Sequence, residues 1–356
     1  MGGRGALGRH GWALAAGGLL GLAGSLLAYL GNPVNTGICI SCFLENAAGA
    51  LALHANPRMQ YLRPELLGFF LGSFAMAAAG REFRPRCRGS APALLGMGIL
   101  MALGAAVFIG CPIKAVLRLA AGDLTAAAGA VGLTVGVWGG IRLLAPAEWV
   151  LGGRERALPA AVPLGAAAAA VVLTALAFVP GALLESRTGG GSLHAPLPWS
   201  LGAGVVLGGL CQRSRFCITG SLRDLLLTRS AWAAAPLVLA LVAAGLANAF
   251  TDQFSLGYHG QPGSHVEWVW SLLGMGLVGA VAVLAGGCPF RQIVKAGEGD
   301  LDALTVIGGM VFGAVLVQNW ALGSNAAGVP AGGKVAVLLG LAAVLSLGLR
   351  QQEDAP

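Results

Sequence analysis

The sequence is poor in charged residues, because only 10% of its 356 residues are Asp, Glu, Lys or Arg while 56% are hydrophobic. A soluble protein of this size needs far more polar surface, so the composition excludes a water-soluble domain. The few charges are grouped between apolar runs long enough to cross a bilayer. We therefore predict a membrane protein, in which the 58 glycines allow helices to pack closely.

Other missing features exclude further classes of function. The chain has no G-x-x-x-x-G-K-[ST] motif, which excludes direct coupling to ATP through a P-loop. It has no basic helix or aromatic-basic platform, so its net charge of +7 does not indicate a nucleic-acid partner. Its C-x-x-C motif lacks the second pair that a zinc site needs, and its histidines lack metal-ligand spacing. The sequence therefore predicts no metal and no other cofactor.

One short motif occurs twice. Gly110-Cys111-Pro112-Ile113-Lys114 returns as Gly287-Cys288-Pro289-Phe290-Arg291, 177 positions later, and the fifteen-residue segments that begin there share six identities. Proline suits the first position of a helix, so each cysteine is predicted at the N-cap of a short helix. That helix end and the basic residue, Lys114 or Arg291, favour a thiolate and attract an anion. A single copy is typical of a buried structural cysteine, but two copies between apolar spans indicate a functional site.

A second pair of short segments accompanies this motif. Residues 36–53 are only moderately apolar and contain Glu45, which predicts a re-entrant helix instead of a full span. Cys217, in segment 212–229, stands 178 residues after Cys39. Irregular backbone at membrane depth is tolerated only where it is buried in protein or lines a polar path. We therefore expect a central pathway lined by Cys39 and Cys111 from one half, and by Cys217 and Cys288 from the other.

The full spans predict an all-α, polytopic inner-membrane protein made of two inverted repeats. Five spans are expected in residues 1–183 and five in residues 184–356, on either side of the Gly- and Pro-rich linker 181–198. Because each half has an odd number of spans, the second half is predicted to cross the membrane in the opposite orientation to the first. With the N-terminus inside, loops 81–88, 142–156 and 223–229 and helix 291–295 are cytoplasmic, as is Arg350, so both termini are predicted to be cytoplasmic. The exceptions, Arg58, Arg63, Arg187 and Lys334, are expected at the interface.

The remaining charged and thiol groups receive separate interpretations. Arg213 and Arg215 accompany Lys114 and Arg291, which indicates an anionic substrate. Four other basic residues are expected to extend to the lipid headgroups: Arg118, Arg223, Arg229 and Lys295. Asp123 and Asp300 are expected to cap helices. Cys39 and Cys42 form the C-x-x-C, whereas Cys87 and Cys211 have no counterpart in the other half and are interpreted as structural.

The paired GCPIK and GGCPFRQ segments, QRSRFCITG and GNPVNTGICISCFLENAAGALALH resemble the YeeE/YedE family of sulfur-compound transporters. The last motif most resembles the YedE branch of selenium transporters. The resemblance covers nearly the whole chain and implies an hourglass-shaped inner-membrane carrier in which cysteines pass thiosulfate along by thiol hydrogen bonds. That role falls on Cys111, Cys217 and Cys288, with Cys39 as the fourth. Cys42 departs from a simple relay, so both sulfur and selenium anions stay open as substrates.

Three functional hypotheses follow. The first is a transporter that moves a small sulfur or selenium anion across the lipid bilayer. The second is a membrane protein that transfers sulfur or selenium between Cys111, Cys217 and Cys288 and a small soluble sulfur-carrier protein, through covalent persulfides. The third is a thiol-redox protein that uses Cys39 and Cys42. A purely structural membrane subunit leaves the duplicated thiols unexplained.

Overall fold

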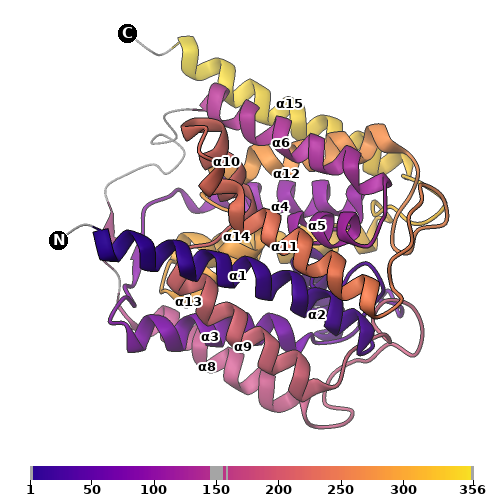
Figure 1. Ribbon diagram of the computed structural model, residues 1–356, viewed down its shortest axis with the longest axis horizontal. Coiled ribbons are helices and arrows are strands. Elements are labelled where there is room, and N and C mark those ends of the chain that lie inside the picture. The colour runs from indigo at the N-terminus through magenta and orange to yellow at the C-terminus, as the bar shows by residue number, and fades with distance from the viewer. Residues whose placement is uncertain (1–2, 145–154, 158, 354–356) are drawn as a thin grey trace.

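The computed structural model describes residues 3–144, 155–157 and 159–353, and most of them are helical (Figure 1). The first half contains the long helices α1 (Gly3–Tyr29), α3 (Pro64–Ala79), α4 (Ala91–Phe108), α6 (Thr125–Leu144) and α8 (Ala161–Ala177), with the short helices α2 (Ile40–Ala50) and α5 (Pro112–Ala120). The second half contains α9 (Leu197–Ser214), α11 (Ala231–Phe250), α12 (Trp268–Leu284), α14 (Leu301–Asn319) and α15 (Ala331–Glu353), with the short helices α10 (Ile218–Thr228) and α13 (Pro289–Gly297). Two-residue strands, β1 (Arg86–Cys87) and β2 (Arg156–Ala157), pair antiparallel.

The helices have the length and composition of membrane spans. Five described segments are long and apolar enough to cross a bilayer: His10–Tyr29, Ala91–Ala120, Ala231–Phe250, Trp268–Gly297 and Leu301–Asn319. Three shorter apolar helices accompany them, Pro64–Ala79, Ala161–Ala177 and Ala331–Ser346. The predicted all-α, polytopic membrane architecture is therefore confirmed.

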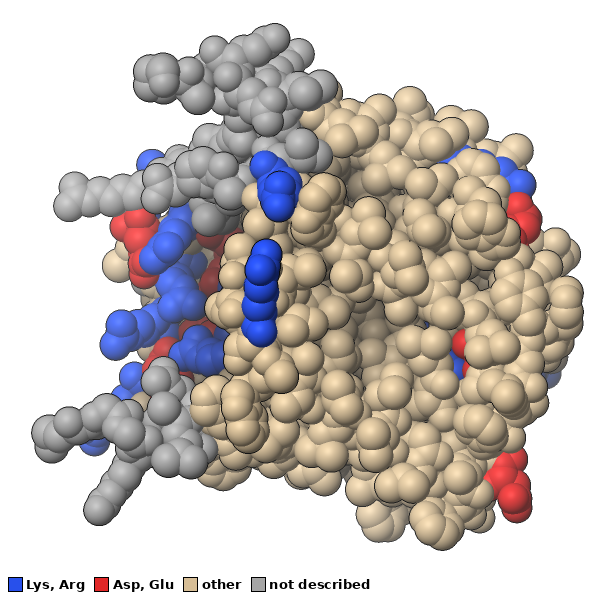
Figure 2. Space-filling view, turned by 45° about the horizontal axis from the view of Figure 1, so that its top comes forward, with Lys and Arg blue, Asp and Glu red and all other residues tan. Residues whose placement is uncertain are grey.

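Basic side chains gather at one end of the molecule. On the face that Figure 2 shows, Lys and Arg concentrate at the left end, and a broad belt almost free of charge adjoins it. Helix α1 begins and helix α15 ends toward the same side in Figure 1. This distribution is the one that the positive-inside rule describes for a multi-pass protein. Arg154, part of a loop expected at this end, lies outside the described residues.

The two halves interlock through reciprocal pairs of helices. Helix α3 packs against α9 and α1 against α11, while α4 packs against α14 and α6 against α12. Chain order matches α1 with α9, α3 with α11, α4 with α12 and α6 with α14, so exchanging the halves exchanges these contacts. The fifth long helices break this relation, because α8 packs against α3 whereas α15 packs against α4 and α12.

Glycine brings the backbones of paired helices into direct contact. A Cβ on Gly72 of α3 would lie 2.0 Å from the carbonyl oxygen of Val205 in α9. A Cβ on Gly21 of α1 would meet the carbonyl of Ala240 in α11 in the same way. Helices that meet so closely gain dispersion contacts along their whole length, which is the main attraction between helices in a membrane.

Gly72→Ala is expected to destabilise the protein by about 1–3 kcal/mol, because the added methyl group forces α3 and α9 apart. Gly202→Ala in α9 is the matched control, since a Cβ there meets nothing within 4 Å. It is expected to stabilise slightly, by about 0.5–1 kcal/mol, because alanine has less conformational freedom than glycine in the unfolded chain. Midpoints of thermal unfolding in detergent measure both changes, and equal shifts would contradict the packing argument.

Arg63 is a correction to the sequence interpretation, which placed it at the interface. Its side chain is 1% exposed. The guanidinium donates to Asn46 Oδ1 at 2.9 Å, to Asn32 Oδ1 at 3.2 Å and to the Gly190 carbonyl at 2.7 Å. These distant acceptors satisfy the charge internally, so the side chain has no need to reach water.

Arg118 is a second correction, because it does not extend to the headgroups. Its side chain is fully buried, and Nε lies 2.7 Å from Asp123 Oδ2. Asp123 also accepts from the Thr125 amide at 2.9 Å, so it joins a buried ion pair in addition to holding the start of α6.

Asp300 accepts from the Ala303 amide at 3.0 Å, which confirms it as the N-cap of α14. Lys295 likewise pairs with Asp300, at 3.5 Å, instead of extending to lipid.

Candidate functional site

Each of the four short helices begins directly after a cysteine. Cys39, Cys111, Cys217 and Cys288 occupy the N-caps of α2, α5, α10 and α13, all with extended backbone. Pro112 and Pro289 take the first helical positions, as predicted from the repeated motif. The four cysteines are buried and carry free thiols. The sequence therefore places each thiol at a helix end whose amides favour negative charge.

The thiols form two pairs, each joining the two short helices of one half. The Ile40 amide donates to Cys111 Sγ at 3.3 Å, which brings the start of α2 to the start of α5. In the second half, Cys217 Sγ lies 3.4 Å from Cys288 Sγ and accepts from the Cys288 amide at 3.5 Å. Pro289 shares a small void with Ser41 and Glu45, so the start of α13 faces the first turns of α2. The four predicted cysteine segments are thus brought together.

A hydroxyl group stands beside one thiol of each pair. Ser41 Oγ lies 3.3 Å from Cys39 Sγ, and Thr219 Oγ1 lies 3.2 Å from Cys217 Sγ. Both hydroxyls come two residues after the cysteine, so the shared pattern C-I-[ST] was the available signal, and the sequence interpretation missed it. The hydroxyls add a rotatable donor at each position.

Cys42 sets the first half apart from the second. Its Sγ lies 2.8 Å from Cys39 Sγ in the first turn of α2. The matching position in α10 is Gly220, so only the first half carries a second thiol. This juxtaposition is suited to thiol–disulfide exchange, because both sulfurs belong to one helix end.

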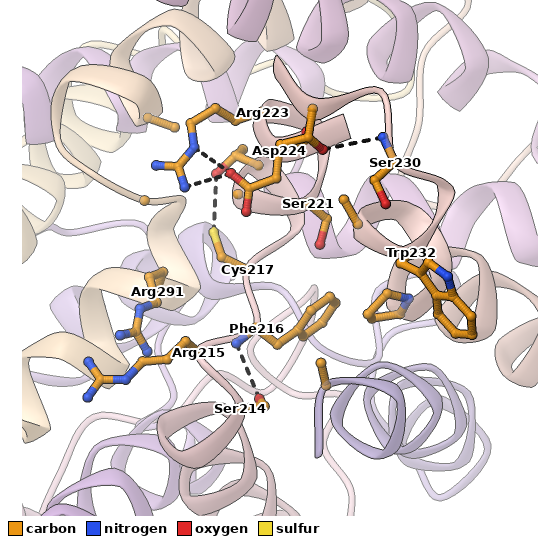
Figure 3. Close-up of a pocket in the computed structure, with 18 of the residues that line it drawn as sticks. Ser214, Arg215, Phe216, Cys217, Ser221, Arg223, Asp224, Ser230, Trp232 and Arg291 are labelled. Carbon is orange, nitrogen blue, oxygen red and sulfur yellow. Dashed lines mark hydrogen bonds and ion pairs between the residues drawn. The ribbon is translucent and has the colours of Figure 1, made fainter. Parts of the chain in front are cut away.

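A cavity of about 540 Å³ leads toward the Cys217 thiol (Figure 3). Arg215, Arg223 and Arg291 line it together with Cys217 and Thr219. The Arg215 and Arg223 side chains are about half exposed, at 52% and 47%, whereas Cys217 is buried. The cavity therefore forms a basic vestibule between the charged end of the molecule and the second thiol pair.

Glutamates hold two of the three vestibule arginines, Arg215 and Arg291, whereas Arg223 pairs with Asp224 at 2.7 Å. Arg291 is 8% exposed and donates to Glu298 Oε1 at 3.0 Å. Arg215 donates to Glu298 Oε2 at 3.2 Å and to Glu82 Oε2 at 3.0 Å. Arg213 pairs with Glu82 at 3.2 Å and lies outside the set of residues that lines the cavity. A hydrogen bond from Gln212, with help from the arginines, lowers the pKa of Glu82 below that of an ordinary carboxyl group.

Lys114 lies at the first thiol pair, under the loop between α11 and α12. Its side chain is 2% exposed. A Cβ on Gly263 of that loop would lie 3.1 Å from Lys114 Nζ, and Thr36 is also adjacent. Seven of the nine predicted site residues lie in the short helices or at their N-caps, whereas Arg213 and Arg215 lie at the end of α9.

Comparison with known proteins agrees with the motifs. Residues 213–348 match a family model described as sulphur transport, and this segment contains Cys217 and Cys288. The thiosulfate transporter TsuA of Escherichia coli (strain K12) is 30% identical over 133 residues, which cover 34% of each chain. The chain therefore matches about a third of the length of that curated relative. Both matches cover only part of the chain and agree there with the resemblance to sulfur-compound transporters of the YeeE/YedE family, while the selenium branch stays a prediction.

Proposed function

We propose that the protein carries a small sulfur- or selenium-containing anion, thiosulfate or a species of similar chemistry, through the membrane along its paired cysteines. The observation that supports this most directly is the placing of four buried thiols at the N-caps of four short helices. We further propose that residues 1–183 and 184–356 are the two repeats. The vestibule and both termini then face the cytoplasm of a cell whose inner membrane holds the protein.

The chemistry of the thiol pairs suits a weakly held anion. A thiol is a weak hydrogen-bond donor that costs little to desolvate, and the amides at each helix start add positive potential. Two successive sites of modest strength allow an anion both to enter and to leave. The hydroxyls of Ser41 and Thr219 stand within reach of the same positions. The vestibule then receives the anion among Arg215, Arg223 and Arg291.

Uptake into proteoliposomes tests this proposal. Wild-type protein is supplied with labelled thiosulfate, selenite or sulfate, and liposomes without protein give the background. We expect saturable uptake of thiosulfate, which carries a terminal sulfur, or of selenite, whose selenium has an exposed lone pair. We expect little uptake of sulfate, because four oxygens enclose its sulfur. Absence of uptake of every anion by folded protein would exclude a self-sufficient carrier.

A second function, sulfur transfer through Cys111, Cys217 and Cys288, is favoured by the 3.4 Å separation of the Cys217 and Cys288 sulfurs, which places successive thiols within reach of one another. In sulfur transfer, a cysteine thiolate attacks the outer sulfur of thiosulfate. The new bond is a cysteine persulfide, the S–S bond of thiosulfate breaks, and sulfite leaves with the electron pair. A small soluble sulfur-carrier protein then accepts the sulfur. Released sulfite and a mass adduct on one cysteine would support this function, whereas unmodified cysteines after transport support the relay.

A further inference from the structure

The two halves treat their matched basic residues differently. Lys114 and Arg291 stand at the same position of the repeated motif, and both are buried. Arg291 is neutralised, because its guanidinium donates to Glu298 Oε1 at 3.0 Å. Glu298 is itself only 2% exposed and also meets Arg215 at 3.2 Å and Arg86 at 3.8 Å. The second half therefore supplies its own counter-anion.

The first half has no such counter-anion. The residue that matches Glu298 is Ala121, as the alignment of Gly122-Asp123-Leu124 with Gly299-Asp300-Leu301 fixes. Within the described part of the chain, Lys114 makes no ion pair within 4.0 Å and donates no hydrogen bond. A buried ammonium without a partner is costly, so this position favours an anion from outside the chain.

Three features converge on that position. The start of α5 directs free amides toward the same region as the Lys114 side chain. Cys111 is the N-cap of the same helix and accepts from the Ile40 amide at 3.3 Å, so the first thiol pair borders the helix end that carries Lys114. The loop that contains Gly263 closes over it and limits access of water. A small anion at this point meets a full positive charge at low local dielectric, where the interaction is strong.

On the basis of the proposed transport function, we propose that Lys114 is the principal anion-binding residue of the pathway. Glu298 competes with the anion for Arg291 and so promotes its release at the Cys217–Cys288 pair. An anion that reaches Arg291 must displace the Glu298 carboxylate. The displaced carboxylate keeps Arg215 and Arg86 as partners, so it stays close and returns readily. The anion therefore binds more tightly at the Cys39–Cys111 pair than at the Cys217–Cys288 pair, from which it leaves into the vestibule.

Calorimetric binding of thiosulfate to the purified protein tests the role of Lys114. Lys114→Gln is expected to weaken binding by about tenfold or more, because a charge-assisted hydrogen bond is lost. Ala121→Glu installs an acid where the second half carries Glu298, and it is expected to weaken binding to a similar degree. Ala121→Gln adds the same bulk without charge and is expected to bind as the wild type does. Thermal unfolding verifies that each variant is folded.

Efflux of thiosulfate from preloaded proteoliposomes tests the role of Glu298. Glu298→Gln keeps the shape of the side chain but frees Arg291 of its counter-charge, so efflux is expected to slow several-fold while equilibrium binding tightens. Unchanged binding in Lys114→Gln, or unchanged efflux in Glu298→Gln, would overturn this inference even if the wild type transports thiosulfate. A wild type that neither binds nor transports thiosulfate or selenite would instead overturn the proposed function together with it.

Discussion

Replacing Cys217 by alanine is expected to reduce the initial rate of thiosulfate uptake by about tenfold to a hundredfold. Cys217 makes several contacts in its pair, because its sulfur lies within hydrogen-bond distance of the Cys288 thiol, the Cys288 amide and the Thr219 hydroxyl. It also lines the vestibule (Figure 3). Losing a donor in a buried site costs about 1–3 kcal/mol, and each 1.4 kcal/mol changes a rate about tenfold. Uptake into proteoliposomes measures the loss.

Cys211→Ala is the matched control for this variant. Cys211 is also fully buried and lies in α9, six residues before Cys217, but its thiol belongs to neither pair. Uptake by Cys211→Ala is therefore expected to equal that of the wild type. Cys217→Ser retains a donor and is expected to fall between the two. Equal uptake by the wild type and Cys217→Ala would remove this cysteine from the pathway.

Asp123→Ala is expected to lower the free energy of unfolding by about 3–5 kcal/mol, because it leaves the buried Arg118 guanidinium without its counter-charge. Neither side chain of this pair is exposed, and their atoms lie 2.7 Å apart. The remaining partners of Arg118 are the Phe108 carbonyl and the Thr125 hydroxyl, which carry no net charge. Chemical or thermal unfolding in detergent micelles measures the change.

The duplication supplies the control for this prediction. Asp300 stands at the position matching Asp123, but its two partners, Lys295 and Arg86, are 18% and 27% exposed and each lies 3.5 Å away. Asp300→Ala is expected to cost about 1–2 kcal/mol, chiefly through loss of the α14 cap. A larger loss at Asp300 than at Asp123 would refute the ranking. Arg118→Met combined with Asp123→Ala is expected to recover much of the stability, because no buried charge then remains.

The local features of the site were predictable from the sequence. Proline after Cys111 and Cys288 defined the starts of α5 and α13, because its fixed backbone angle suits that position in any surroundings. The moderate polarity of segment 36–53 likewise distinguished α2 from a full span. Each of these signals involves residues close together in the sequence, so it can be interpreted without knowledge of the fold.

Features that depend on distant partners were not predictable in this way. The sequence interpretation placed Arg63 at the interface because a hydropathy pattern records its charge. The pattern contains no information on the acceptors from Asn32, Asn46 and Gly190, which lie beside Arg63 only in the folded chain. Glu298 received no role because its contact with Arg86 joins segments far apart in the chain. The different positions of α8 and α15 also escaped prediction, since both are apolar helices of ordinary length and only packing separates them.

The backbone contacts at Gly21 and Gly72 also bear on how fast the molecule can work. Where helices are in direct backbone contact, no side chain can change its rotamer to accommodate a shift of one helix along the other. Large rotations of one half against the other therefore have a high free-energy cost. Motion is left to side chains and short segments, which rearrange on nanosecond to microsecond timescales, whereas domain rocking takes microseconds to milliseconds. We therefore expect the proposed transport to be limited by the time that the anion spends at each thiol pair, and not by the opening and closing of a gate.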